Sequence, residues 1–301
     1  MSSHNPAQRF AFIAVLGAPN AGKSTLVNAL TGVKVSIVSP KVQTTRSRVR
    51  GIMVSGDTQL VLVDTPGIFK PGRRLDRAMV SSAWNAAGEA DKRLLLIDAP
   101  KGVGADTAAI IQNLEQTKQK TILVINKIDL IQKDKLLPLI AGLAKHPIFT
   151  DTFLISAQTG ENVDELKQFL IGLAPPGPWL FPDDEVSDIP NRLFAAEITR
   201  EKIFMLLQKE LPYHITVMTN AYREEKESVR IEQTIVVGRE SHKPIVVGHK
   251  GAMIKKIGEN ARRELTRLLG KKVNLFLFVK VQENWTEDPA QYNAWGLDFN
   301  A

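Results

Sequence analysis

Short, uninterrupted apolar runs punctuate the first half of the chain, and longer segments with helical spacing separate most of them. Each run has the length and composition of a strand that is buried on both faces, as in a parallel sheet covered by helices. The runs are Phe10–Leu16, Leu60–Val63, Leu94–Ile97, Ile122–Ile125 and Thr152–Ile155. This alternation predicts an α/β domain with a mostly parallel, doubly wound sheet.

One stretch of this half departs from the parallel pattern. Between Gly51 and Val63, two β-rich runs meet at the polar turn Ser55–Asp57. A short Gly-containing turn between two such runs is typical of a hairpin. We therefore expect one antiparallel strand on an otherwise parallel sheet.

A proline-rich segment follows the last helical stretch of the first half. Residues 174–190 contain five prolines and a short acidic run that extends to Asp188. Proline removes a backbone donor, and helices usually end before it. The sequence therefore predicts a first domain over residues 1–174 and a linker over residues 175–190.

The order of elements changes after the linker, where helical and strand-like segments no longer alternate. The expected elements are a helix at Asn191–Lys209, strands at Tyr213–Asn220 and Val229–Val237, a helical turn at Pro244–Val247, a helix at Met253–Leu269 and a strand at Val273–Val281. This order, α-β-β-α-β, predicts a smaller α+β domain over residues 191–281. Residues 282–301 then form a C-terminal tail.

Composition places the chain among soluble globular proteins. Its 301 residues are 44% hydrophobic and 24% charged, with no cysteine, so neither disulfides nor thiolate metal sites are expected. No apolar run approaches the ~18 residues of a membrane span, and the N-terminal residues lack the pattern of a signal peptide. We expect a cytoplasmic protein, in keeping with a reducing compartment, and a monomer.

Positive charge is concentrated in the second half. The net charge is +7, and residues 241–280 carry ten Lys and Arg against two Glu, whereas residues 281–301 carry four acidic residues and no Lys or Arg. A concentrated basic region favours a polyanionic partner, either nucleic acid or an anionic membrane surface.

The stretch GAPNAGKS, Gly17–Ser24, fits the phosphate-loop pattern G-x-x-x-x-G-K-[ST] and lies between a predicted strand and a predicted helix. Its glycines allow a tight turn in which backbone N–H groups point at a β-phosphate, next to the positive end of the helix dipole. Lys23 supplies a charge to the β- and γ-phosphates, and the Ser24 hydroxyl suits Mg²⁺.

Three further motifs follow predicted strands in the order that a nucleotide site requires. In DTPG, the Asp64 carboxylate can hold Mg²⁺ through water and the Gly67 N–H can contact a γ-phosphate. In NKID, Asp129 can accept two hydrogen bonds from the N1–H and 2-amino group of guanine, donors that adenine lacks, so this carboxylate selects GTP over ATP. Asn126 would brace the loop, and the Lys127 stem can lie along the base. In SAQTG, the backbone N–H groups after Ser156 can meet guanine O6.

These four motifs together resemble those of the translation-factor-like GTPases over about residues 1–173, which implies a P-loop GTPase domain that uses Mg²⁺. The candidate GTP-binding residues are Gly17, Ala18, Pro19, Asn20, Ala21, Gly22, Lys23, Ser24, Thr25, Asp64, Thr65, Pro66, Gly67, Ile68, Asn126, Lys127, Asp129, Ser156 and Ala157. The resemblance assigns catalysis to Lys23, Thr45 and Gly67. It places Mg²⁺ on Ser24, Thr45 and Asp64, with Thr45 favoured over Thr44 as the ligand that joins when GTP is bound.

Two positions set this chain apart from many GTPases. Ile68 stands where many relatives have a glutamine that orients water, so slow intrinsic hydrolysis is expected. Asn20 matches the position at which some relatives coordinate K⁺ near the phosphates, against the alternative that it only braces the loop. We therefore expect Mg²⁺ as cofactor and carry K⁺ as a hypothesis.

A second glycine-rich loop, GHKG at Gly248–Gly251, stands at the start of the last long helix. With its flanking apolar residues it resembles the signature of KH domains, in which the GxxG turn clamps a single-stranded RNA backbone and bases lie on an adjoining apolar groove. The resemblance implies RNA contacts at the turn and at the lysines that follow it. These residues are Gly248, His249, Lys250, Gly251, Lys255 and Lys256.

A GTPase domain joined to a C-terminal KH domain resembles the Era family of bacterial ribosome-assembly GTPases. The stretches QTTR (43–46), AAEITREKIF (195–204) and ELPYHITV (210–217) extend this resemblance over nearly the whole chain. It implies binding of GTP and GDP, binding near the 3′ end of small-subunit ribosomal RNA, and a role in maturation of the small ribosomal subunit. Family members also contact the inner membrane weakly. Two alternatives stay open: an RNA-binding scaffold with a structural nucleotide site, and a membrane-associated cell-cycle GTPase.

Overall fold

The computed structural model describes residues 7–208 and 210–301. Residues 1–6, which we assigned to the first domain, and Lys209, at the end of a predicted helix, lie outside the described residues. The chain divides into two compact units, each described separately below. Of the described residues, the first unit comprises 7–36, 45–188 and 293–301, and the second comprises 37–44, 189–208 and 210–292.

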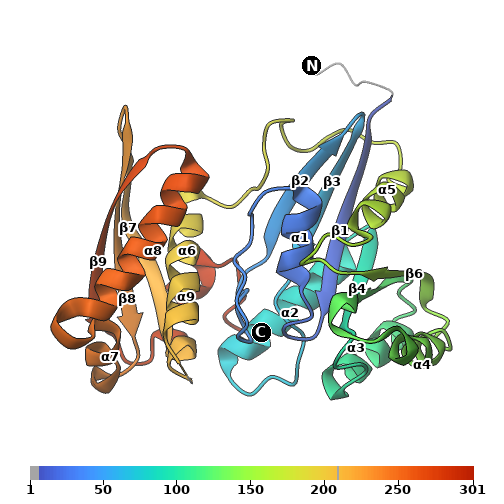
Figure 1. Cartoon of the computed structure of the whole chain (residues 1–301), viewed down its shortest axis with the longest axis horizontal. Helices are drawn as coiled ribbons and strands as arrows, with labels where there is room; N and C mark the ends of the chain where they lie inside the picture. The colour runs from blue at the N-terminus through green and yellow to red at the C-terminus, as the bar shows by residue number, and fades with distance from the viewer. Residues whose placement is uncertain (1–6, 209) are drawn as a thin grey trace. The chain divides into compact units, whose positions relative to one another are not determined.

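The first unit is built on a six-stranded sheet with the order β2-β3-β1-β4-β5-β6 (Figure 1). Its strands are β1 (Arg9–Gly17), β2 (Val49–Ser55), β3 (Thr58–Asp64), β4 (Lys92–Asp98), β5 (Thr121–Asn126) and β6 (Phe149–Ile155). All neighbours pair in parallel except β2 and β3, which form the expected hairpin at one edge. The apolar strands are almost fully buried, as the uninterrupted runs in the sequence predict.

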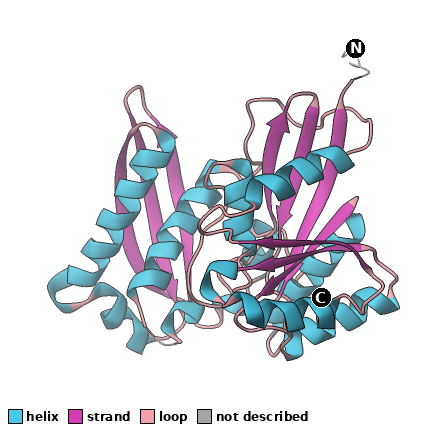
Figure 2. Cartoon of the chain, turned by 45° about the vertical axis from the view of Figure 1, so that its right-hand side comes forward, coloured by secondary structure: helices cyan, strands magenta, loops and turns pink. Residues whose placement is uncertain are grey.

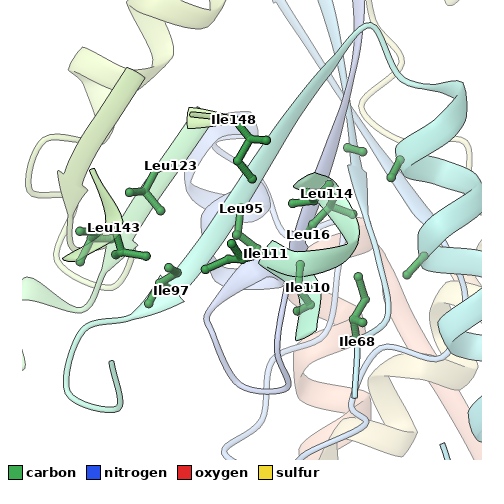
Figure 3. Packing of buried hydrophobic residues seen from close by; sticks show 14 of the residues in the cluster. Leu16, Ile68, Leu95, Ile97, Ile110, Ile111, Leu114, Leu123, Leu143 and Ile148 are labelled. Atoms are coloured by element: carbon green, nitrogen blue, oxygen red, sulfur yellow. The ribbon is translucent and has the colours of Figure 1, made fainter. Parts of the chain in front are cut away.

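Within the described part of the first unit, four α-helices connect these strands and a fifth follows the last strand. They are α1 (Lys23–Thr31), α2 (Arg74–Glu89), α3 (Ala105–Gln116), α4 (Lys133–Leu143) and α5 (Val163–Leu173), with the 3₁₀ turn η1 (Ile128–Leu130) after β5. Helices α2, α3 and α4 share one apolar cluster with the central strands, in which Leu16, Leu95 and Leu123 meet Ile110 and Ile111 (Figure 3). Helices α1 and α5 contact each other and α1 packs on β1 and β3, so the sheet is doubly wound.

The proline-rich segment is ordered along the first unit. Its Pro175 and Val186 carbonyl groups accept hydrogen bonds from the backbones of β1 and β2, and the Gln59 side chain of β3 bonds the backbone of Leu180 and Phe181. Residues 175–188 therefore belong to the first compact unit.

The second unit is a three-stranded sheet, β7-β8-β9, with long helices on one face (Figures 1 and 2). Its elements are α6 (Asn191–Leu206), η2 (Leu211–His214), β7 (Ile215–Glu224), β8 (Ser228–Val237), η3 (Glu240–His242), α7 (Lys243–Val247), η4 (His249–Gly251), α8 (Ala252–Leu269), β9 (Lys272–Val281) and η5 (Trp285–Glu287). The short helix α9 (Pro289–Ala294) begins in this unit, and its last two residues belong to the first. Strands β7 and β8 are antiparallel, and β8 and β9 are parallel. The residues of α6 and α8 that face the sheet, including Ile203 and Ile257, form its core.

The structure confirms the predicted fold class, an α/β unit with one antiparallel strand followed by a smaller α+β unit. One helix is shorter than its spacing predicts: α6 ends at Leu206, because Leu207 is extended and its N–H closes the last turn on Ile203. Among the described residues, no helix is long and apolar enough to cross a lipid bilayer.

Candidate functional site: a strand-end nucleotide site and a basic GxxG turn

The four predicted nucleotide motifs lie at the carboxyl-terminal ends of the parallel strands of the six-stranded sheet. Gly17 ends β1, Asp64 ends β3 and Asn126 ends β5, while Ser156 follows β6 directly. In the register, Val15 lies opposite Asp64, and Asn126 opposite Ile155. The carboxyl ends of parallel strands in such sheets are where ligands bind.

The phosphate loop turns tightly before α1. Gly22 has φ +96°, and its carbonyl accepts the first helical hydrogen bond from Leu26. A Cβ on Gly22 would lie 2.2 Å from the amide nitrogen of Asn126, so only glycine fits there. The loop therefore places backbone N–H groups and a helix N-terminus at one point, which suits an anion. Thr25 lies in the first turn of α1.

Lys23 is buried beneath this loop. Its ammonium donates to the carbonyl groups of Gly17 and Ala18, each at 3.1 Å. Burial lowers the pKa of Lys23 to about 8, a shift that the nearby Asp64 carboxylate partly opposes. A bound phosphate would raise this pKa again, because its negative charge stabilises the ammonium form that burial disfavours.

Three oxygen-bearing side chains from separate motifs converge beside Lys23. The Ser24 hydroxyl donates to the Asp64 carboxylate at 2.7 Å, the Ser24 and Thr45 hydroxyls are 2.9 Å apart, and Thr45 donates to Asp64 at 3.4 Å. Burial raises the pKa of Asp64, against the hydrogen bond from Ser24 and the charge of Lys23. Hard oxygen donors around a buried carboxylate fit Mg²⁺, whose charge would favour the carboxylate form.

The neighbouring Thr44 is oriented elsewhere. Its hydroxyl bonds the Ser39 hydroxyl at 2.6 Å and the Lys41 carbonyl at 2.8 Å, and its own carbonyl accepts a hydrogen bond from Arg200. Thr44 belongs to the second compact unit and Thr45 to the first. Of the two candidate threonines, Thr45 is thus the one that lies at the oxygen cluster.

The DTPG segment lies against the phosphate loop. Thr65 donates to the Val15 carbonyl at 2.7 Å, and a Cβ on Gly67 would approach Pro19 to 2.9 Å. Pro66 is buried between these two residues in the segment. This close approach puts the Gly67 backbone beside the loop that would hold the phosphates.

Ile68 faces the core. Its N–H donates to the Gly17 carbonyl at 3.1 Å, and its side chain, only 5% exposed, belongs to the apolar cluster that includes Leu16 and Ile110 (Figure 3). An apolar side chain in this position offers no group that could orient an attacking water, and slow intrinsic hydrolysis stays a prediction.

Asn126 joins the two ends of the site. Its amide nitrogen donates to the Ala21 carbonyl at 2.8 Å, and its amide oxygen accepts from the Ala157 N–H at 2.9 Å. The buried Ser156 hydroxyl accepts from the Thr159 N–H and holds the following turn. The phosphate loop and the SAQTG loop are thereby fixed to the same strand end.

The side chains of Lys127 and Asp129 differ in their contacts and in their exposure. The Lys127 ammonium donates to the Asn20 carbonyl at 2.7 Å and to the Asp98 carboxylate at 2.6 Å, whereas Asp129 is exposed at the 3₁₀ turn after β5. Sequence reasoning missed Asp98. The signal was present, because LLLID also ends an apolar strand in a carboxylate.

The second candidate site is the turn between α7 and α8. Gly248 and Gly251 have φ +75° and +80°, and Lys250 between them has φ +48°. A Cβ on Gly248 would meet the backbone nitrogen of Met253 at 2.7 Å, whereas nothing lies within 4 Å of one on Gly251. Close packing against Met253 requires glycine at position 248, and the positive φ favours glycine at both positions 248 and 251.

Basic side chains surround this turn. His249, Lys250, Lys255 and Lys256 are all exposed, and the Lys255 ammonium lies 4.0 Å from Glu259 on the same helix. Beside them, Met253 and Ile254 of α8 and Leu277 of β9 are partly buried apolar residues. The arrangement can present charge to a sugar-phosphate backbone and apolar surface to bases.

Two sequence-family models match the chain, one in each half. Residues 12–127 match the family described as 50S ribosome-binding GTPase, and residues 210–286 match the KH domain. The chain is 53% identical over 294 residues to the GTPase Era of Bradyrhizobium diazoefficiens, covering 97% of this chain and 96% of that protein. It is 53% identical over 292 residues to the GTPase Era of Brucella suis, covering 97% and 94%.

Two solved structures have closely similar folds over the full length. One is Era in complex with MgGDPNP and nucleotides 1506–1542 of 16S ribosomal RNA, with a TM-score of 0.91, 42% identity and coverage of 96% of this chain and 99% of that one. The other is a substituted Aquifex aeolicus Era bound to GDP and AlF4⁻, with a TM-score of 0.91, 41% identity and the same coverage.

Proposed function

Because the chain belongs to the Era family of GTPases, we propose that it binds and hydrolyses GTP and acts on small-subunit ribosomal RNA during assembly of the small ribosomal subunit. The two halves have different ligands: GTP or GDP at Gly17–Ser24, and the RNA backbone at Gly248–Gly251.

The cluster of Ser24, Thr45 and Asp64 is the observation that carries the GTPase half. Each residue comes from a separate motif, and their oxygens lie within hydrogen-bond distance of one another. The Ser24 and Thr45 hydroxyls would bind Mg²⁺ directly, and Asp64 would hold it through water. A Mg²⁺ held there would supply positive charge to the phosphates, while Lys23 and the Gly67 N–H would orient the γ-phosphate.

Choice of the guanine base rests on the exposed Asp129, whose carboxylate would accept from N1–H and the 2-amino group. The Ser156 N–H donates to the Glu161 carbonyl at 3.0 Å and the Ala157 N–H donates to the Asn126 amide oxygen at 2.9 Å, so both groups hold the turn that follows β6. A contact from either group to guanine O6 would require the release of one of these hydrogen bonds.

For the RNA half, the turn geometry and the local charge support the proposal. Era in one solved complex is bound to nucleotides 1506–1542 of 16S ribosomal RNA. The present chain has the conformationally demanding glycines and the exposed basic residues that a KH turn needs to approach a phosphate backbone. We place its RNA site at Gly248, His249, Lys250, Gly251, Lys255 and Lys256.

Potassium is a finer element of the proposal. Asn20 has φ +63° within the phosphate loop, and its carbonyl accepts a hydrogen bond of 2.7 Å from the Lys127 ammonium. We assign to Asn20 a K⁺ near the phosphates, which would supply positive charge where Ile68 supplies none. Equal GTP turnover in sodium and potassium buffers, with and without RNA, would contradict this assignment.

One experiment tests the two main functions together. GTP turnover by the full chain is measured alone, with a synthetic 16S 3′-end RNA, and with vesicles containing anionic lipid. We expect slow turnover that the RNA increases, and loss of that increase in Lys250→Asp. Absence of any RNA effect would favour the scaffold alternative, and stimulation by vesicles alone would favour a membrane-associated GTPase with weak peripheral contact.

A further inference from the structure

The C-terminal tail divides between the two compact units. Its first part stays with the three-stranded sheet: the Trp285 indole donates to the His214 carbonyl at 3.1 Å, and the Gln291 amide donates to the Met218 sulfur at 3.2 Å. Residues 293–301 instead belong to the first unit, which contains the nucleotide site. The last residues of the chain are therefore part of the GTPase unit.

Within that unit, two tail aromatics each hold an arginine. The Arg46 guanidinium lies 5.5 Å from the centre of the Trp295 ring, and both side chains are buried, at 3% and 6% exposure. The Arg74 guanidinium lies 4.3 Å from the Phe299 ring and also donates to the Phe299 carbonyl at 3.4 Å. Cation–π contacts strengthen when water is excluded, as at Trp295.

The positions of these arginines give the contacts their meaning. Arg46 directly follows Thr45, the residue that brings a hydroxyl to Ser24 and Asp64. Arg74 is the first residue of α2, at the end of the segment that begins with DTPG. Each tail aromatic thus anchors the downstream end of one of the two segments that would contact the γ-phosphate and its Mg²⁺.

We propose that Trp295 and Phe299 are positioning residues of the GTPase site. They hold Arg46 and Arg74, and through them they hold Thr45 and the DTPG segment beside the phosphate loop. This inference rests on the proposed function, because it concerns the same nucleotide site. Without these contacts, more free energy is needed to order both segments when a nucleotide binds. Because both segments would contact the γ-phosphate and its Mg²⁺, the affinity for GTP should fall more than the affinity for GDP.

The test compares a GTP analogue with GDP in the full-length protein. Affinities for Mg²⁺ with a non-hydrolysable GTP analogue, and with GDP, are measured for wild type, Trp295→Ala, Phe299→Ala and the double variant. We expect the double variant to lose about tenfold in affinity for the GTP analogue, a size that two modest cation–π contacts can supply. Its affinity for GDP should stay within about twofold of wild type.

Rescue and coupling separate positioning from general destabilisation. Trp295→Phe and Phe299→Tyr retain a ring for the arginine and should recover most of the affinity for the GTP analogue. The effects of Trp295→Ala and Arg46→Gln should not add, because both remove the same contact. Phe278→Ala, which removes an exposed aromatic of β9, serves as the matched control and should change neither affinity.

The outcomes are distinct. Equal losses for GDP and the GTP analogue, or no loss in the double variant, would overturn the positioning role. Additive effects of Trp295→Ala and Arg46→Gln would also contradict it. A wild-type protein that binds no GTP analogue would instead overturn the proposed function itself, and with it this inference.

Discussion

The side-chain amide of Asn126 fills the space that a side chain on Gly22 would need: a Cβ on Gly22 would lie 2.2 Å from its nitrogen. The same amide donates to the Ala21 carbonyl and accepts from the Ala157 N–H. Because the absence of a side chain on Gly22 makes room for this amide, one glycine allows Asn126 to hold both the phosphate loop and the SAQTG loop. A single buried side chain therefore holds both the phosphate loop and the turn after β6.

Gly22→Ala should disturb both loops at once. The new methyl group displaces Asn126 from its two partners, and φ +96° strains any residue with a side chain. We expect the free energy of unfolding to fall by at least about 2 kcal/mol and GTP affinity to fall more than about tenfold. Thermal unfolding and nucleotide titration measure the two effects.

Gly88→Ala is the matched control for that substitution. Gly88 lies within α2, and nothing lies within 4 Å of a Cβ built there. Alanine should stabilise the helix by about 0.5–1 kcal/mol and leave GTP affinity unchanged. If the two variants behaved alike, the packing of Gly22 against Asn126 would not be the cause.

The parts of this architecture that depend on local pattern were predictable from the sequence, whereas the parts that depend on long-range placement were not. Burial on both faces makes a strand such as β5 read as a continuous apolar run, and the phosphate loop, DTPG and NKID each follow a strand end. The LLLID run indicates a carboxylate at a strand end, but the pairing of Asp98 with Lys127 depends on long-range placement, because Lys127 follows the next strand. The placement of Trp295 beside Arg46 could not be predicted either, because the two residues are distant in sequence and Trp295, unlike Arg46 of the QTTR stretch, stands in no motif.

GTP binding should take up a proton in mildly alkaline solution. Burial lowers the pKa of Lys23 to about 8 in the nucleotide-free protein, and phosphates favour the charged ammonium, so binding raises this pKa. Below pH 8 the ammonium is already charged and affinity should depend little on it. Above pH 8 affinity should fall, by up to about tenfold per pH unit.

Calorimetry at pH 8.5 in buffers with different ionisation enthalpies measures this uptake directly. At that pH the phosphates of free GTP are already deprotonated, because their last pKa is about 6. A proton taken up on binding therefore goes to a group of the protein. We expect more than about half a proton per GTP bound. A value near zero would contradict this expectation, and the same measurement on Asp64→Asn would show whether a proton released by Asp64 had cancelled the uptake.

RNA binding should weaken steeply with salt, and each basic residue at the turn should contribute to the slope. Lys250, Lys255 and Lys256 are exposed beside Gly251, so each is available to a backbone phosphate. Replacing one of them by alanine should reduce the slope of log K against log salt by about 0.7, the value for single-stranded nucleic acid. Filter binding over a range of KCl concentrations measures it.

Lys226→Ala provides the control for the salt experiment. Lys226 lies in the loop between β7 and β8, outside the GxxG turn and the first turns of α8. Its removal should leave the slope unchanged. A uniform reduction for all four lysines would point to a diffuse electrostatic attraction in place of a defined site at Gly248–Gly251.

Asp129→Asn should exchange one purine preference for another. The carboxylate of Asp129 is exposed at the 3₁₀ turn after β5, where it would accept from the N1–H and 2-amino group of guanine. Asparagine replaces one acceptor with a donor, which opposes the 2-amino group of guanine and suits the 2-oxo group of xanthine. Each mismatched hydrogen bond costs about 1–3 kcal/mol, so we expect GTP affinity to fall by about tenfold or more and XTP affinity to rise. Competition between GTP, XTP and ATP for the variant measures the change, and unaltered discrimination between GTP and ATP, without a gain for XTP, would show that Asp129 does not contact the base.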